Sequence, residues 1–182
     1  KAVVNLPNSI DKNERNFSEL DLEKFFLALD EVIENVIVFR SMEGDSIKID
    51  LENNSNLISQ LLKDVVTLSK KHSAKLKDSL NKKINDLMVD LDKNRLEQEV
   101  IYYLEKIDIN EEIIRLKKHI ELFTKTINQK SPIGKKLNFV CQEIGREVNT
   151  IGSKCSEFQI QSSVINMKEY LEKIKEENFN IL

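Results

Sequence analysis

The sequence predicts an all-α protein built from several long amphipathic helices. Apolar residues recur every three or four positions through most of the 182 residues, the spacing that places them on one face of an α-helix. The chain contains only four glycines and two prolines, whereas an all-β chain needs a turn about every ten residues. Hydrophobic residues make up 40% of the chain, which is enough to bury a core in one or two domains.

The first 93 residues are predicted to contain an irregular lead-in, one helix and a long helical arm. Residues 1–21 form the lead-in, and from residue 22 the apolar period predicts a helix that ends near Gly44. A polar, asparagine-rich stretch at 52–56 follows, and then a heptad-like apolar series runs from Ile58 to Leu91. Within the region 22–93, that series predicts a single helix of more than about thirty residues, projecting as a coiled-coil-like arm.

Residues 94–182 are predicted to form a C-terminal bundle of four helices. Asp108 stands three residues before Glu111, a spacing that resembles a capping box and predicts a helix start. The Pro-Gly segment at 130–134 predicts a break between two helices. The predicted helices are, in order, 95–107, the helix from Asp108 to Ile127, the helix that carries apolar residues from Leu137 to Phe158, and 162–177.

Charge and hydropathy exclude several classes of protein. The formal net charge of −3 gives no global basic field of the kind that marks many nucleic-acid binders. No apolar run approaches the roughly 20 residues of a membrane span, and no charged-then-apolar signal pattern opens the chain, so we predict a cytoplasmic protein with no membrane partner. The first residue is Lys1 and not Met, which indicates a fragment. Cys141 and Cys155 are too far apart on one helix for a disulfide and are predicted to be buried thiols.

Two polar stripes could carry chemistry. On the helix that begins at Asp108, residues spaced by three and four share one stripe, namely Asp108, Glu112, Arg115 and His119. The next helix repeats the pattern with Glu143, Glu147, Thr150 and Lys154, flanked by Arg146. If the stripes face each other, they assemble carboxylates, an imidazole and cations within metal-ligand or proton-transfer reach. The alternative is that both are ordinary solvated faces with ion pairs.

One region of the chain is concentrated in lysine. Six lysines stand between residues 117 and 136 against one acid, Glu121. Lys135 and Lys136 lie just after the Pro-Gly turn, where a helix start and its lysines could hold backbone phosphates, although Lys-rich helices also occur without ligands. Nothing resembles a P-loop, a dinucleotide fingerprint or a zinc-ligand set, so no nucleotide cofactor is expected.

Several motifs together resemble the YicC/YloC family of endoribonucleases. The resemblance rests on Asn-Arg-Leu-Glu-Gln-Glu at 94–99, on the Asp-Ile-Asn-Glu-Glu stretch that leads to His119, and on Gln-Glu through Arg-Glu-Val-Asn-Thr to Ser-Lys at 142–154. Arg-Ser-Met-Glu-Gly at 40–44 is similar to that family's Arg-x-x-Glu-Gly element. Two departures are Asn138, where the family usually has aspartate, and Gly145, where it has asparagine.

The resemblance implies a metal-dependent endoribonuclease that cleaves RNA phosphodiester bonds by hydrolysis in a homo-oligomer, a hexamer, whose members carry a further N-terminal domain. It implies Mg²⁺ or Mn²⁺ as the cofactor. The implied metal ligands are Glu97, Glu99, Glu112, His119 and Glu143. The implied catalytic groups are His119, Glu143, Glu147 and Glu112, and the RNA-binding groups are Arg95, Arg115, Arg146 and Lys154, with Lys135 and Lys136 added from the lysine-rich region. The alternative function is a non-catalytic oligomeric module that binds RNA or a protein.

Overall fold

A computed structural model describes residues 18–86, 93–129 and 132–179 of the chain. Within these ranges the protein consists of five α-helices and contains no β-strand, so the predicted all-α class is confirmed. The chain divides into two units, one that ends at Glu43 and one that begins at Gly44. The predicted division of the C-terminal part at residue 94 stays a prediction.

The first helix is α1 (Glu19–Asp86), and it runs without a break through both positions where the sequence predicted an interruption, Gly44 and the stretch 52–56. Those two predictions are wrong because the apolar period continues across the polar stretch. Leu51 and Ile58 are buried on either side of it, and the small Ser55 between them is buried as well. A polar run therefore ends a helix only if it also removes the buried stripe.

The unit before Gly44 contributes one helical segment, residues 19–43 of α1. Every side chain of this segment is exposed, including a stripe of large apolar residues at three-and-four spacing. The members of this N-terminal apolar stripe are Leu22, Phe25, Phe26, Leu29, Val32, Ile33, Val36 and Ile37. Such a stripe is the pattern of a helix face that packs against another element.

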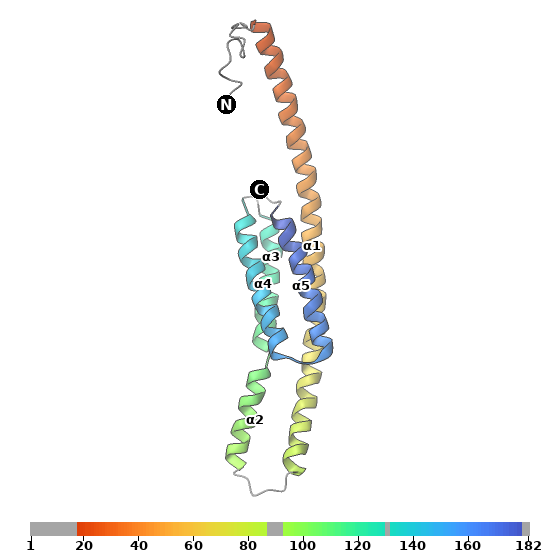
Figure 1. The fold of residues 1–182 in the computed structure, drawn as a ribbon, viewed down its shortest axis with the longest axis vertical. Helices are drawn as coiled ribbons and strands as arrows, with labels where there is room; N and C mark the ends of the chain where they lie inside the picture. The colour runs from red at the N-terminus through yellow and green to blue at the C-terminus, as the bar shows by residue number, and fades with distance from the viewer. Residues whose placement is uncertain (1–17, 87–92, 130–131, 180–182) are drawn as a thin grey trace, which may run out of the picture. The chain divides into compact units, whose positions relative to one another are not determined.

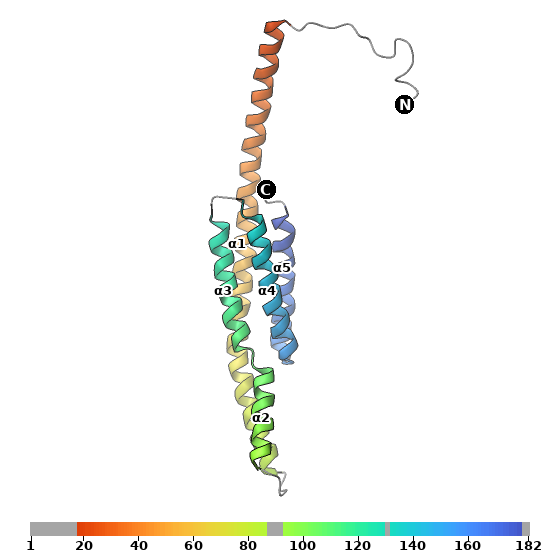
Figure 2. The same ribbon diagram turned by 90° about the vertical axis from the view of Figure 1, so that its left-hand side faces the viewer.

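The second unit is a helical bundle with one hydrophobic core. Its helices are α2 (Lys93–Ile107), α3 (Asn110–Ile127), α4 (Gly134–Lys154) and α5 (Phe158–Asn178), together with the part of α1 after Gly44. In both views α3, α4 and α5 lie beside the part of α1 that follows Gly44 (Figures 1 and 2). The core joins buried side chains from all four of these helices, such as Val65, Phe123, Ile144 and Met167. Val65 belongs to the predicted arm, so that part of the arm packs in the bundle.

The helix boundaries near Asp108 and Phe158 differ from the predicted ones. Asp108 does not form a capping box, because α3 begins at Asn110 and the Asp108 carboxylate accepts the Asn110 backbone N–H at 3.1 Å. Phe158 opens α5 and does not close α4, which ends at Lys154. The apolar period crosses the short connection unchanged, and only the Glu157 side chain, which accepts the Ile160 N–H at 2.9 Å, marks the new helix start.

Three further expectations concern single residues and membrane spans. Cys141 and Cys155 are buried free thiols, as predicted. Gly145 lies where α4 meets α5, and a Cβ there would stand 3.3 Å from Leu171 Cδ2, so this glycine permits close helix packing. Among the described residues, none of the helices has a stretch apolar and long enough to cross a membrane.

Candidate functional site

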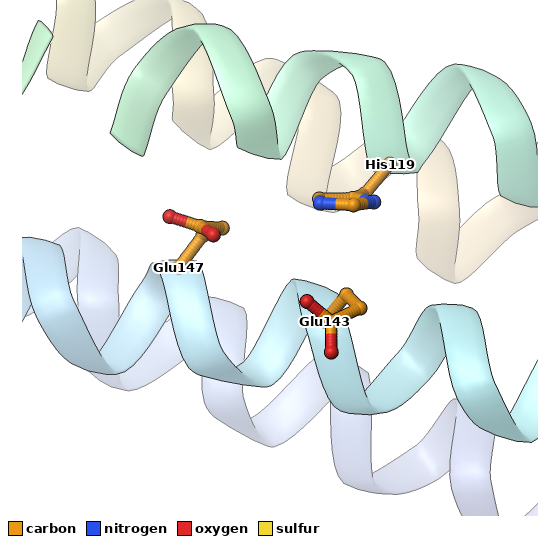
Figure 3. Close-up of side chains that lie close together, drawn as sticks. All are labelled: His119, Glu143 and Glu147. Atoms are coloured by element: carbon orange, nitrogen blue, oxygen red, sulfur yellow. The ribbon is translucent and has the colours of Figure 1, made fainter. Parts of the chain in front are cut away.

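His119, Glu143 and Glu147 converge where α3 faces α4. Each side chain offers one ligand atom, and these three atoms all lie within 4.8 Å of one another. Glu143 and Glu147 are four residues apart on α4, which puts both carboxylates on the same helix face. Figure 3 shows Glu147 directed from α4 toward α3 and His119 directed from α3 toward α4, with Glu143 on α4 one turn from Glu147. We call these three residues the His-Glu-Glu cluster.

The cluster is largely shielded from solvent. Glu147 is only 4% exposed, the Glu143 side chain is 17% exposed, and His119 is half-buried. Two carboxylates this close and this dry repel each other and lose hydration, so their ionised forms need a compensating positive charge. A cation or a protonated imidazole supplies that charge, which makes the cluster a place for a metal ion or for proton transfer.

The donor set fits a divalent ion of intermediate softness. One imidazole nitrogen and two carboxylate oxygens are ligands of divalent transition-metal ions, whereas Mg²⁺ sites are built mostly from oxygen and water. The three ligand atoms lie within 4.8 Å of one another, so a single ion between them would be within reach of all three side chains.

A cation marks the outer edge of the cluster. The Arg146 guanidinium lies 3.3 Å from the Glu143 carboxylate, one helical turn away on α4. The Arg146 side chain is 71% exposed, so most of its donors remain in contact with water. An exposed ion pair of this kind adds little to stability. Its guanidinium is instead well placed to meet an anionic group that approaches Glu143.

Glu112 lies outside the cluster although it belongs to the same predicted stripe as His119. The Lys154 ammonium is 2.8 Å from the Glu112 carboxylate and also donates to the Asp108 carbonyl at 3.1 Å. The Glu112 side chain is 7% exposed, and its Oε2 atom has no partner among the described residues. Two residues predicted for different roles, a metal ligand and an RNA contact, therefore neutralise each other in an ion pair of which Glu112 is buried and Lys154 is half-buried.

The family of the chain is established by comparison with known proteins. A family model described as the C-terminal region of YicC-like endoribonucleases matches residues 65–182, which is more than half of the chain. The chain belongs to the YicC-like endoribonuclease family. This confirms the resemblance found in the sequence.

Two relatives match nearly the whole chain. A probable endoribonuclease YicC from Clostridioides difficile strain 630 is 34% identical over 187 residues, which cover 99% of this chain and 64% of that protein. A probable endoribonuclease YicC from Haemophilus influenzae strain Rd is 26% identical over 186 residues, covering 98% of this chain and 62% of that protein. The chain thus spans less than two-thirds of the length of these relatives.

The other residues implied by the YicC resemblance lie apart from the cluster or outside the described side chains. Arg115 on α3 is exposed and pairs with Glu111 in the preceding turn. On α2, Arg95 and Glu99 are exposed, and the side chain of Glu97 lies outside the described part of the chain. Their implied roles stay predictions.

The start of α4 carries Asn138, one of the two departures of this YicC-like chain from the family pattern, and the last two lysines of the lysine-rich region. Lys135 and Lys136 are exposed, and Lys136 donates to the Gln129 side chain at 3.1 Å. Asn138 accepts a hydrogen bond at 2.7 Å from the buried Asn178 of α5, so it links two helices. Sequence reasoning missed Phe139, which is 60% exposed. The available signal was its position off the apolar stripe of α4.

Proposed function

We propose that this protein is a metal-dependent endoribonuclease that hydrolyses internal phosphodiester bonds of RNA at the His-Glu-Glu cluster. The single observation that carries the proposal is the convergence of three ligand-type atoms within 4.8 Å at the junction of α3 and α4. Membership of an endoribonuclease family supplies RNA as the substrate class. The names of both relatives call them probable endoribonucleases.

The donor set favours Mn²⁺ over Mg²⁺ as the cofactor, because it includes an imidazole. When bound there, such an ion would lower the pKa of a coordinated water and offset charge on the cleaving phosphodiester. His119, Glu143 and Glu147 would hold it. The metal roles implied for Glu97, Glu99 and Glu112 remain predictions outside this proposal.

The remaining catalytic roles can be assigned to the chain's own residues from how exposed each side chain is. Glu143 is the more exposed carboxylate of the two, so its oxygen can accept a proton from a water molecule that enters from solvent. Glu147 is buried and would keep its neighbours oriented and exclude water from the inner side. The His119 imidazole would complete the ligand set, and the leaving oxygen can take its proton from the protonated Glu143 or from solvent water. Arg146 would bind the phosphate at the outer edge.

A direct test compares cleavage of an end-labelled RNA by the purified protein with Mn²⁺, with Mg²⁺ and with EDTA. Glu147→Gln, Glu143→Gln and His119→Ala should each lower the rate by at least 100-fold, roughly the contribution of one acid or base group. Glu121→Gln is the matched control, since Glu121 is exposed on the same helix as His119. Equal cleavage in EDTA, or full activity in the three cluster variants, would remove the proposal.

We further propose that the protein works as a cytoplasmic homo-oligomer, a hexamer as the family resemblance implies. The N-terminal apolar stripe supports assembly, because a monomer rarely exposes so many large apolar side chains on one helix. Ile33→Lys should reduce the mass measured by light scattering. Glu31→Lys, on the opposite side of the same helix, should leave that mass unchanged. The same mass for both variants would count against a role for the stripe.

The second candidate function is a non-catalytic oligomeric module that binds RNA or a protein, and the same stripe favours it. In that case the cluster is a structural polar contact between α3 and α4. The two functions separate in one comparison: a binding module keeps its RNA affinity in Glu143→Gln and Glu147→Gln and shows no metal-dependent cleavage.

A further inference from the structure

Phe139 presents an aromatic ring to solvent beside the His-Glu-Glu cluster. It is 60% exposed, whereas the apolar stripe of α4, which includes Leu137, Val140 and Ile144, is fully buried in the core. The helix therefore packs without using the Phe139 ring. A large aromatic side chain that the core does not need is available for contact with a ligand.

The helix places this ring in line with the cluster and with two cations. Phe139 stands four residues before Glu143, so their Cβ atoms are neighbours about 5–6 Å apart on one helix face. Lys135 stands four residues before Phe139, and Arg146 stands seven residues after it, which keeps both on the same side of α4. Along the axis, the order Lys135, Phe139, Glu143 rises about 6 Å at each step.

Exposed lysines on α3 and at the start of α4 suit a polyanion. Lys117, Lys118 and Lys125 on α3 are exposed, as are Lys135 and Lys136 at the start of α4. Lysines can bind the phosphates of a polyanion, but an exposed phenyl ring cannot, because it offers only a flat apolar face. Alternation of cations with an aromatic ring is the combination that binds single-stranded nucleic acid, with phosphates on the cations and a base stacked on the ring.

We infer that Phe139 is a stacking platform for one unpaired base of single-stranded RNA. Lys135 and Lys136 hold the backbone beside that base, so that the adjoining phosphodiester is directed to Glu143 of the cluster. The inference rests on the proposed function for its RNA substrate and adds to it a preference for unpaired nucleotides. Bases within a duplex stay stacked on each other and cannot cover the ring.

The chain contains no tryptophan, which makes a specific experiment possible. Phe139→Trp introduces a single tryptophan, which can be excited apart from the three tyrosines, and its emission should be quenched when oligouridylate is added in EDTA, where cleavage cannot occur. An abasic oligonucleotide of the same length, or a blunt RNA duplex, should leave the emission unchanged. Phe158→Trp is the matched control, because Phe158 is 82% exposed on α5 and its tryptophan should not be quenched.

Affinity provides the second measurement. Phe139→Ala should weaken binding of oligouridylate roughly tenfold, the loss typical of one stacked base, and Phe139→Trp should restore it. Phe158→Ala should bind as the unaltered protein does. Sedimentation of each variant checks that assembly is the same.

Three outcomes would overturn the inference. They are no quenching of Phe139→Trp, unchanged affinity in Phe139→Ala, or an affinity loss accompanied by a smaller assembly, which would assign the ring to a contact between copies. The proposed hydrolysis is tested separately. Quenching of Phe139→Trp without any metal-dependent cleavage would support the stacking platform and contradict the nuclease. Metal-dependent cleavage with unchanged affinity in Phe139→Ala would support the nuclease and contradict the stacking platform.

Discussion

The Lys154 ammonium lies 2.8 Å from the Glu112 carboxylate, across 42 residues of sequence, and closes one end of the contact between α3 and α4. His119 follows Glu112 by seven residues on α3, and Glu147 precedes Lys154 by seven residues on α4. Because the two helices are antiparallel, the His-Glu-Glu cluster lies about two helical turns from the ion pair. One polar seam between the helices contains an ion pair and a cluster in which two carboxylates meet one imidazole, with Arg146 paired to Glu143 at its outer edge.

Removal of Lys154 should destabilise the fold more than removal of both partners. Lys154→Met leaves the Glu112 carboxylate buried without its cation, which should lower the free energy of unfolding by about 2–3 kcal/mol. The double variant Glu112→Gln, Lys154→Met should recover at least half of that loss, because no buried charge remains. Urea denaturation of the four proteins in the cycle measures the coupling. Equal losses in the single and double variants would contradict a desolvated pair.

Mn²⁺ should stabilise the unaltered protein through the cluster, independently of any activity. At a concentration 100-fold above the dissociation constant, the gain is about 2.7 kcal/mol, visible as a rise in Tm of several degrees. Glu147→Gln should abolish the rise. In EDTA this variant should be at least as stable as the unaltered protein, since it relieves repulsion between two carboxylates. A rise in Tm of the same size in Glu147→Gln would place the Mn²⁺ elsewhere.

Alanine at three helical glycines should affect stability in a graded order. Gly44 has no neighbouring atom within 4 Å of an added Cβ, so alanine should stabilise the helix by about 0.5–1 kcal/mol. At Gly145 the nearest atom is 3.3 Å away on a flexible leucine, and the gain in helix propensity should roughly cancel the crowding. At Gly152 the added Cβ would lie 3.0 Å from Val164 Cγ1, and a stiff β-branched side chain cannot move aside.

Gly152→Ala should therefore lower the free energy of unfolding by about 1–2 kcal/mol, the usual effect of overpacking. Urea denaturation of the three variants against the unaltered protein tests the ranking. If Gly152→Ala is the most stable of the three, the contact between α4 and α5 is looser than the distance indicates.

Cys141 should weaken the fold at alkaline pH. Burial raises the pKa of its thiol from 9.0 to about 11, a shift that Lys175 reduces and Glu172 increases. Between those values the unfolded chain releases a proton that the folded chain retains, so stability is complete below pH 9.0 and falls as the pH rises toward 11. The loss should reach roughly 1 kcal/mol by pH 10.

Cys141→Ala removes this term, so its unfolding free energy should decline less steeply than that of the unaltered protein between pH 8.5 and about 10. All other groups that titrate at alkaline pH are the same in both proteins. The effect of the Cys141 thiol is therefore the difference between their two curves of unfolding free energy against pH. Parallel curves would show that the thiol titrates alike in the folded and unfolded chains.

The sequence alone determined the helical class, the stripes that became the core, and the candidates for the cluster. Helix periodicity assigns each residue an angle around its own axis, so Glu143 and Glu147 were known to share a face before any contact was known. The distance between Cys141 and Cys155 along one helix excluded a disulfide, and the predicted buried thiols are confirmed. Local polarity misled only where a buried stripe continued beneath it, as at 52–56, or where a short connection preserved the apolar period, as before Phe158.

Only the tertiary structure decided which residues of the two stripes meet. Periodicity says nothing about how far one helix is shifted along another, and a shift of two turns would have brought Glu112 to Glu147. Core packing sets that shift, because the buried side chains of α3 and α4 interdigitate in one alignment. In that alignment Glu112 meets Lys154, and His119 is the member of its stripe that reaches the two glutamates.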